Sequence, residues 1–505
     1  MSALNTGVPE EFKHVQLADM SESSQPVVCG EQPTEPAGAA VPARKTDAAL
    51  AVPPRQRLRL TAILLYVVLG VALSLAIAEI TDSAQSGSRP PPAPQPPPPP
   101  ALSGGSGGAA ASGRYRNLFV EAGLANEAAV QSRVDEAFSQ LFFGRKSDEA
   151  VFFESSEGTA YVSESESSRK HDVRTEGMSY GMMIAAQRGN ASAFEALWRW
   201  AQLNMRHSDP RSPYFGYFAW SCTQAGGHIY EGPASDGEVW FAAALYTAAG
   251  RFGEPRYASA AEALLADVVF RERAPPVTRL FEVATGVSDA PVQVTFVPEG
   301  SAAGYTDPSY HVPAFLELFR RHAPSAETRS FWARALSSSR NLLQRAGQTP
   351  SGLAPDKCGF DGTPKFVAGL ASPNHAYDGW RVAQNHAMDA SWFDADPRHA
   401  ASCERILQFF ARANATAPQP QGYGDVHSVY GEQLSPYHSA GLVAMNAVCA
   451  LAVRDAALAR PFLVELWHAP TPTGAYRYYN GLLHMLALLQ LSGGFRYYGP
   501  PSPEE

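Results

Sequence analysis

Residues 126–144 read NEAAVQSRVDEAFSQLFFG, and their apolar side chains recur at helical spacing. Val130, Val134 and Phe138 lie four positions apart, so they share one face of a predicted helix. Comparable patterns follow at short intervals, over residues 192–205, 238–249, 256–271, 309–322, 326–346, 376–394, 399–413, 439–455 and 475–491. The sequence therefore predicts an all-α domain.

The stretch 278–298 is the one place in this domain where the composition favours β-strands. About a dozen helices joined by short connections suit either a solenoid or a closed double ring of helices. A solenoid requires a fixed-period repeat, and the sequence shows none. We therefore favour the closed double ring.

The N-terminal part of the chain has a different character. Leu60–Ala78 runs for 19 residues without a charge, which is long enough to cross a bilayer as a helix. Arginines precede this run at positions 55, 57 and 59, and acidic residues follow it. This asymmetry predicts a type II membrane protein whose N-terminus is cytosolic and whose large domain lies in the secretory-pathway lumen or outside the cell. A cleaved signal peptide ending near Ala78 is the alternative, but the apolar run is long and starts far from Met1.

Residues 90–100 contain nine prolines, and a Gly/Ser/Ala tract follows to residue 113. Such a segment forms a stiff spacer followed by a flexible joint. We therefore predict four parts: a disordered cytosolic tail (1–59), a transmembrane signal anchor (60–79), a stalk (80–113) and one large domain (114–505). The four cysteines of that domain allow three disulfide pairings, and free buried thiols are an equal alternative.

Composition and motifs exclude several classes of function. The chain has 40 basic and 49 acidic residues, a net charge of −9, whereas a nucleic-acid-binding protein needs a basic surplus. It contains no His-x-x-x-His or Cys-x-x-Cys pair and no glycine-rich phosphate loop after a strand. We therefore expect no nucleic-acid partner, no metal and no cofactor. Paired carboxylates are the remaining candidates for chemistry.

Two candidate carboxylates lie near predicted helix starts. Glu176 precedes an apolar helix body, and a buried carboxyl there would hold a proton and could act as a general acid. Asp236 lies in GPASDGE, where neighbouring glycines let a ligand approach and where Ser235 and Glu238 predict a capping box. For each acid the alternative is a structural interaction with the helix dipole.

A third candidate is a polar stripe on the predicted helix 376–394. It consists of Asp378, Arg381, Asn385 and Asp389. Trp380 and Trp392 flank the stripe, and aromatic rings beside polar groups are suited to binding sugars. A solvated helix face is the alternative interpretation.

Taken together, these segments resemble glycoside hydrolase family 8 from about residue 117 to residue 498, and within it the reducing-end xylose-releasing exo-oligoxylanases. The stretches that carry the resemblance are VRTEGMSYGMMIA (173–185), GYFAW (216–220), GPASDGE (232–238), TDPSYHVPAF (306–315), YDGWRV (377–382), GLVAMNA (441–447) and YRYYNGLLHMLALLQLSGGFRYY (476–498). The resemblance implies an (α/α)6 barrel and an inverting hydrolysis of β-1,4-linked xylo-oligosaccharides. It implies Glu176 as the proton donor, Asp378 as the base and Asp236 as the residue that holds the distorted sugar.

The residues expected to contact the sugar are Tyr180, Trp220, Tyr310, Trp380, Arg381, His438 and Tyr479. His438 lies on a loop before an apolar helix, where it is a candidate to block one end of the binding site; a surface-loop histidine is the alternative. Asp389 is the alternative base. The alternative functions are an endo-acting β-1,4-glucanase or chitosanase on the same barrel, and a catalytically inactive sugar-binding module. The presence of all three carboxylates argues against the inactive module.

Overall fold

The computed structural model describes residues 108–163, 172–283, 290–370, 372–416 and 422–500. The predicted tail (1–59), the predicted membrane segment (60–79) and most of the predicted stalk (80–113) lie outside these ranges. Within the ranges, no helix combines the length and the apolar character that a membrane span requires.

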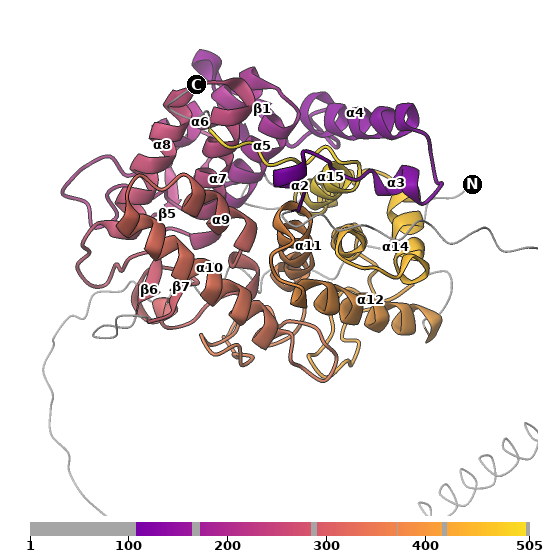
Figure 1. Ribbon diagram of the computed structural model, residues 1–505. Helices are drawn as coiled ribbons and strands as arrows, with labels where there is room; N and C mark the ends of the chain where they lie inside the picture. The colour runs from indigo at the N-terminus through magenta and orange to yellow at the C-terminus, as the bar shows by residue number, and fades with distance from the viewer. Residues whose placement is uncertain (1–107, 164–171, 284–289, 371, 417–421, 501–505) are drawn as a thin grey trace, which may run out of the picture. The chain divides into compact units, whose positions relative to one another are not determined.

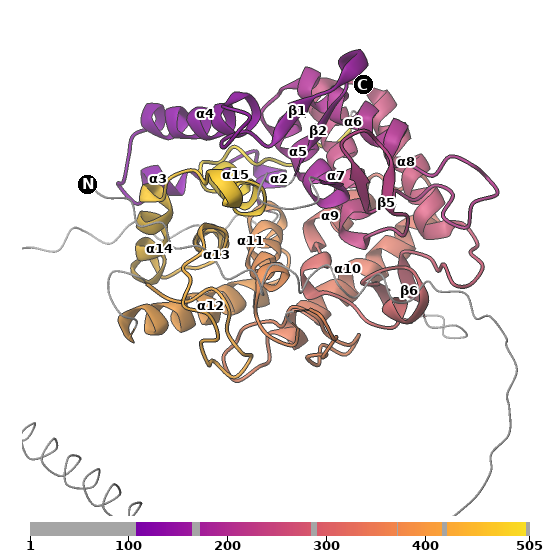
Figure 2. The ribbon, with the colours of Figure 1, turned by 180° about the vertical axis from the view of Figure 1, so that it is seen from behind.

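Six helices form an inner ring in which each helix contacts the next and the last contacts the first. They are α5 (Thr175–Gln187), α7 (Ser235–Phe252), α9 (Pro313–Arg321), α11 (Arg381–Phe393), α13 (Ala440–Val448) and α15 (Tyr479–Leu491). Six outer helices each contact one of them: α4 (Glu127–Phe143), α6 (Ala191–Asn204), α8 (Pro255–Leu265), α10 (Ala326–Ala346), α12 (Arg398–Thr416) and α14 (Ala456–His468). Figures 1 and 2 show outer helices such as α4, α12 and α14 at the periphery of the domain. This arrangement is the (α/α)6 barrel that the resemblance implied.

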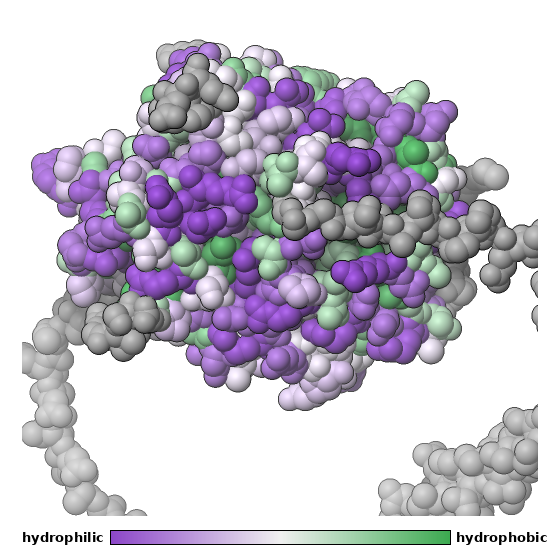
Figure 3. Space-filling model, viewed as in Figure 1, coloured by the Kyte–Doolittle hydropathy of each residue, from purple (hydrophilic) through white to green (hydrophobic). Residues whose placement is uncertain are grey.

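The inner and outer helices differ in how many of their side chains are buried. In α7, every residue from Ser235 to Ala249 is buried, and in α15 so is every residue from Gly481 to Leu491. In α4, by contrast, buried residues recur at helical spacing and the others face outward. A helix that is apolar on all sides is stable only inside a domain, so the apolar segments form the inner ring. One face of the domain is accordingly mainly hydrophilic, with apolar residues scattered over it (Figure 3).

The described part of the domain is mostly helical, as predicted, but short strands accompany the helices. Three small antiparallel sheets accompany the helices: β1 (Phe152–Glu154) with β2 (Ala160–Val162), then β3 (Asp172–Arg174), β4 (Ser221–Thr223) and β5 (His228–Tyr230), and finally β6 (Phe281–Val283) with β7 (Val292–Val294). The last pair confirms the strands expected within 278–298. The other strands have three residues each, too short for a period-2 pattern to reveal them.

Two helix details also differ from the sequence-based predictions. Helix α14 had no predicted counterpart, because Pro461 lies inside it and a proline normally ends a helix. Helix α7 starts without a side-chain cap, so the predicted capping box of Ser235 and Glu238 is wrong. Instead, the buried Glu238 carboxylate accepts a hydrogen bond from the Phe218 backbone N–H. The short helices α2 (Gly108–Ser112) and α3 (Leu118–Glu121) complete the described α-helices.

The N-termini of the inner helices meet at one end of the ring. The starts of α5, α7 and α11 are in direct contact through their side chains. The start of α13 is fixed to that of α15 by a 2.8 Å hydrogen bond from the Gly441 N–H to Asn480. Helix N-termini carry partial positive charge, so this end of the barrel favours carboxylates.

Gly237 permits the close approach of α7 to α5. A Cβ atom at this position would lie 2.5 Å from both the Cβ and the Oγ1 of Thr175. We predict that Gly237→Ala lowers the free energy of unfolding by about 1–3 kcal/mol, the usual cost of overpacking a core. The matched control is Gly304→Ala, since a Cβ there meets no atom within 4 Å. Thermal unfolding of both variants measures the difference, and equal melting temperatures would contradict this account of Gly237.

Candidate active site

Arg381, the first residue of α11, connects the three carboxylates that the sequence singled out. Its Nη1 lies 3.1 Å from Glu176 Oε2 and 3.2 Å from Asp236 Oδ2. Its Nη2 donates to Asp378 Oδ1 at 2.6 Å, and Nη1 also donates to the Tyr180 hydroxyl at 2.6 Å. One guanidinium group thus brings together residues from α5, α7 and the 3-10 turn that precedes α11.

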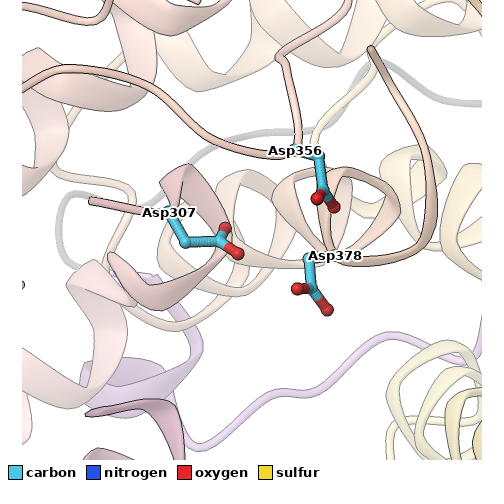
Figure 4. A group of neighbouring side chains, drawn as sticks. All are labelled: Asp307, Asp356 and Asp378. Atoms are coloured by element: carbon cyan, nitrogen blue, oxygen red, sulfur yellow. The ribbon is translucent and has the colours of Figure 1, made fainter. Parts of the chain in front are cut away.

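A second buried cation contacts Asp378 from the other side. Lys357 Nζ donates to Asp378 Oδ2 at 2.9 Å, to Asp307 Oδ2 at 2.8 Å and to Asp356 Oδ2 at 3.1 Å. Figure 4 shows the three aspartates close together, with the carboxylates of Asp307 and Asp356 directed toward the space between them. Each offers an oxygen within 4.8 Å of the others, a spacing that could suit a metal ion. Here the ammonium group of Lys357 supplies the positive charge among them.

The sequence-based reasoning missed Lys357, Asp307 and Asp356. Asp307 lies within the TDPSYHVPAF segment, so that segment could have identified it. Asp356 and Lys357 are adjacent in a loop between α10 and α11 that has no periodic pattern. Nothing in the sequence alone indicates that this loop passes beneath Asp378.

The two predicted catalytic carboxyl groups are more exposed to solvent than the two cations that contact them. The Glu176 side chain is 16% exposed and that of Asp378 13%, whereas Arg381 and Lys357 are only 4% and 2% exposed. The two predicted catalytic carboxyls therefore lie at the surface of the cluster, and the two cations lie beneath them.

The pKa values of Glu176 and Asp378 are shifted in opposite directions. Burial, together with the charges of Asp236 and Asp378, raises the pKa of Glu176 to about 8 against the opposing effect of Arg381. Burial acts in the same direction on Asp378, but the charges of Arg381 and Lys357 outweigh it and hold the pKa of Asp378 well below its usual range. At neutral pH the site thus contains a neutral acid beside an anionic base, the pair that acid–base hydrolysis requires.

Asp236 is the least exposed of the three carboxylates, at 6%. Its Oδ1 accepts a hydrogen bond from the Gly237 N–H at 2.9 Å, and Oδ2 contacts Arg381. Burial raises its pKa although Arg381 opposes the change. A side chain fixed at both oxygens is suited to orienting a substrate group.

Three of the predicted sugar-contacting tyrosines surround the cluster. Tyr180 accepts from Arg381, and the ring of Tyr310 lies 5.7 Å from the Arg381 guanidinium carbon. Tyr479 donates its hydroxyl to the Tyr377 carbonyl oxygen at 2.9 Å. That contact supports a strained backbone, since Tyr377 has a φ of 33°, which is uncommon for a bulky residue. The strain lies immediately before Asp378 and is held there by Tyr479.

Trp220 lies beside the start of α5, where its backbone oxygen accepts from the Thr175 N–H at 3.0 Å. Its ring is partly exposed and lies 5.3 Å from the guanidinium carbon of Arg174. A partly exposed indole next to Glu176 remains compatible with the expected contact to a sugar.

Two predicted sugar-contacting residues, Trp380 and His438, form hydrogen bonds to other groups of the protein. Trp380 is only 2% exposed, and its indole N–H donates to the Asp425 backbone oxygen at 2.9 Å, so it packs in the core. His438 contacts the Tyr423 carbonyl through Nδ1 and the Glu465 carboxylate through Nε2, each at 2.7 Å. Both partners are acceptors, so both ring nitrogens donate and neither is left for a sugar hydroxyl. The polar atoms of both residues are thus already paired within the protein, and their contact with a sugar stays a prediction.

The predicted polar stripe divides into two separate groups. Asp389 accepts from Arg340 at 2.8 and 3.0 Å and pairs with His399 at 2.7 Å, and its side chain is 0% exposed. Asn385 donates to the backbone oxygens of Ser309 and His311. Asp389 is therefore part of a structural ion pair, which removes it as the alternative base.

Residues 177–181 read GMSYG and match the Gly-x-Ser-x-Gly pattern of serine hydrolases. Ser179, however, is 0% exposed within α5, and its hydroxyl donates to the Glu176 carbonyl oxygen at 3.0 Å. A serine nucleophile needs an exposed hydroxyl on a sharp turn. This serine therefore has a structural role.

The comparison with protein families matches residues 151–493 to the family described as glycosyl hydrolases family 8. This match covers more than half of the chain. The chain belongs to that family. It is therefore a glycosidase, with its acidic cluster at the N-terminal end of the inner helices.

Its relatives share the barrel and much of the sequence. A reducing end xylose-releasing exo-oligoxylanase of Halalkalibacterium halodurans is 36% identical over 399 residues, which cover 77% of this chain and 96% of that protein. The corresponding enzyme Rex8A of Paenibacillus barcinonensis is 33% identical over 77% of this chain and 97% of its own length. A crystal structure of a xylobiose complex from Teredinibacter turnerae, 37% identical, superimposes with a TM-score of 0.71 over 78% of this chain and all of that chain.

We predict opposite substrate dependence for two substitutions at the centre of this site. Glu176→Gln cannot donate a proton, so hydrolysis should slow by about 10²–10⁴-fold, and the loss should shrink for aryl glycosides or glycosyl fluorides, whose leaving groups need little protonation. Asp378→Asn removes the base, and its loss should persist with those substrates. Steady-state kinetics on both kinds of substrate measure the difference.

The pH dependence follows from the raised pKa of Glu176. The proton is present below a pKa of about 8 and lost above it, so wild-type activity should fall as the pH rises through that value. Asp389→Asn is the control, because it lies in the same helix and should retain the wild-type pH profile. Near-normal activity in Asp378→Asn together with loss of activity in Asp389→Asn would contradict the assignment.

Proposed function

We propose that this protein is an inverting glycosidase that hydrolyses β-1,4-linked xylo-oligosaccharides. The observation that carries the proposal is the contact of a single guanidinium group, that of Arg381, with the carboxyl groups of Glu176 and Asp378, one with a raised and the other with a lowered pKa. The substrate class is supported by relatives that are named for the release of xylose from oligoxylans.

The proposed reaction uses one residue for each proton. Glu176 donates its proton to the glycosidic oxygen as the bond from that oxygen to the anomeric carbon breaks. A water molecule on the opposite face attacks the anomeric carbon and gives its proton to Asp378. The sugar leaves with the opposite anomeric configuration, as in other enzymes that use an acid and a base with a water between them.

Asp236 and Arg381 act by orientation in this scheme. Asp236 is fixed by the Gly237 N–H and by Arg381, so it can hold a hydroxyl of the sugar at the point of cleavage. Arg381 holds the carboxyl groups of Glu176 and Asp378 in position relative to each other. It takes no part in proton transfer, because an arginine in a protein stays charged.

We further propose that cleavage releases single xylose units from the reducing end. The loop before α13 is a candidate to close that end of the site, because His438 fixes it to Glu465 of α14 and to Tyr423. In this arrangement His438 acts by holding the loop. Endo-acting cleavage of xylan is the alternative, since one related crystal structure is that of a xylanase from Teredinibacter turnerae in complex with xylohexaose.

The proposed location follows from the sequence of the N-terminal part. An apolar run at residues 60–78 behind three arginines supports a signal anchor, and the Pro-rich segment after it supports a spacer. The catalytic domain would then act on the luminal or extracellular side of a membrane.

Product analysis tests the proposed reaction. Purified protein incubated with xylo-oligosaccharides should release xylose and the oligosaccharide one unit shorter, and ¹H NMR of the fresh product should show the α-anomer from the β-linked substrate. Cello-oligosaccharides serve as the comparison. Early internal cuts in long xylan would contradict the exo mode alone, whereas a retained β-anomer would contradict the roles given to Glu176 and Asp378.

A protease-protection experiment tests the proposed topology. In sealed vesicles of the secretory pathway, external protease should remove only the N-terminal tail and leave the catalytic domain intact, because the arginines favour a cytosolic N-terminus. Addition of detergent is the control that exposes the domain. Degradation of the domain in intact vesicles would reverse the assignment.

A further inference from the structure

Lys357 is nearly fully buried, and the reaction described above does not use it. Its side chain is 2% exposed and contacts three aspartates within 3.1 Å. Each partner is fixed independently. Asp307 accepts from the Ser309 N–H at 2.7 Å, the Asp356 N–H donates to the Asn374 backbone oxygen at 2.7 Å, and Asp378 is held by Arg381. The ammonium group therefore lies in a preformed site between the segment before α9 and the loop before α11.

Asp378 lies in a cluster that contains more carboxyl groups than cations. Four other carboxyl groups face Asp378: Glu176 from α5, Asp236 from α7, Asp307 from the turn before α9 and Asp356 from the loop after α10. The phenol groups of Tyr310 and Tyr479 also lie beside it. Against these five carboxyl groups, Asp378 included, stand the two cations that contact it, Arg381 and Lys357. Arg381 is shared with Glu176 and Asp236, so it cannot serve Asp378 alone.

The two oxygens of Asp378 are held by different cations. Oδ1 accepts from Arg381 at 2.6 Å and Oδ2 from Lys357 at 2.9 Å. A carboxylate has about four lone-pair sites, so these contacts leave Asp378 able to accept a hydrogen bond from a water molecule. Lys357 thus fixes the rotation of the carboxylate while leaving it able to accept a proton.

We propose that Lys357 is a positioning residue that, held by Asp307 and Asp356, keeps Asp378 oriented and anionic for its role as the base. This inference rests on the proposed function of Asp378. The neighbouring aspartates support it, because burial raises the pKa of Asp307 to about 7 and that of Asp356 to about 6 in spite of Lys357, whereas the pKa of Asp378 is held well below its usual range. At neutral pH Asp356 is therefore mostly ionised and Asp307 partly so, while Asp378 stays fully charged.

The test compares the pH profiles of variants that change one charge each. Lys357→Met removes the cation, so kcat should fall at least tenfold with KM within about threefold of wild type, and the acid limb of the kcat profile should move up by at least about one pH unit. Asp356→Asn removes a negative neighbour and should not raise the acid limb. Lys365→Met is the control, because Lys365 is an exposed lysine of the same loop, and it should match the wild type.

The assay uses whichever xylo- or cello-oligosaccharide the wild-type protein cleaves fastest, so an error in the proposed sugar leaves this test intact. If Lys357→Met does not fold, the double variant Lys357→Met/Asp356→Asn removes one charge of each sign and should still show the raised acid limb. The inference is wrong if the acid limb of the folded variant coincides with that of the wild type, or if Asp356→Asn moves it upward to the same extent. A loss of kcat with an unchanged pH profile would assign Lys357 a merely structural role.

Discussion

The rest of the site depends on the contacts of one guanidinium group, that of Arg381, with three carboxyl groups. This guanidinium group lies at the start of α11 and reaches carboxylates from α5, from α7 and from the turn before α11 itself. Without its charge, Glu176, Asp236 and Asp378 would be like charges in a poorly solvated space, where burial alone favours the neutral form of each. Its unequal contacts leave Glu176 neutral and Asp378 ionised, because Asp378 has the shorter contact and also pairs with Lys357.

The closed ring of inner helices makes this contact possible. Each inner helix is buried on nearly all sides, so it can be satisfied only by neighbours around its whole circumference. Closing the ring brings the helix N-termini to one end, where Gly237 allows α7 to lie against Thr175. The strained backbone at Tyr377 is maintained next to Asp378 in the same region. Stability is thus concentrated in the apolar ring, and chemistry is placed where the helix starts converge.

Much of this could be predicted from the sequence, and the exceptions have physical reasons. The apolar period of residues 126–144 corresponds to α4, and the prediction for 326–346 matches α10 at both ends. Glu176, Asp236, Asp378 and Arg381 do come together, as the family resemblance implied. Lys357 could not be found, because its importance arises from a loop path rather than from any local pattern. Trp380 and His438 were assigned to the sugar because residue type alone does not reveal that their polar atoms are already paired within the protein.

The central claim is that Glu176 carries a proton at neutral pH while Asp378, bound to the same arginine, does not. Infrared difference spectroscopy in the carboxylic-acid C=O region tests this without substrate, by subtracting the spectrum of Glu176→Gln, and separately that of Asp378→Asn, from that of the wild type. The account predicts that a neutral-acid band is lost in Glu176→Gln and that this band titrates away in the wild type as the pH passes about 8, with no corresponding loss in Asp378→Asn. A neutral-acid band lost in Asp378→Asn but unchanged in Glu176→Gln would contradict it.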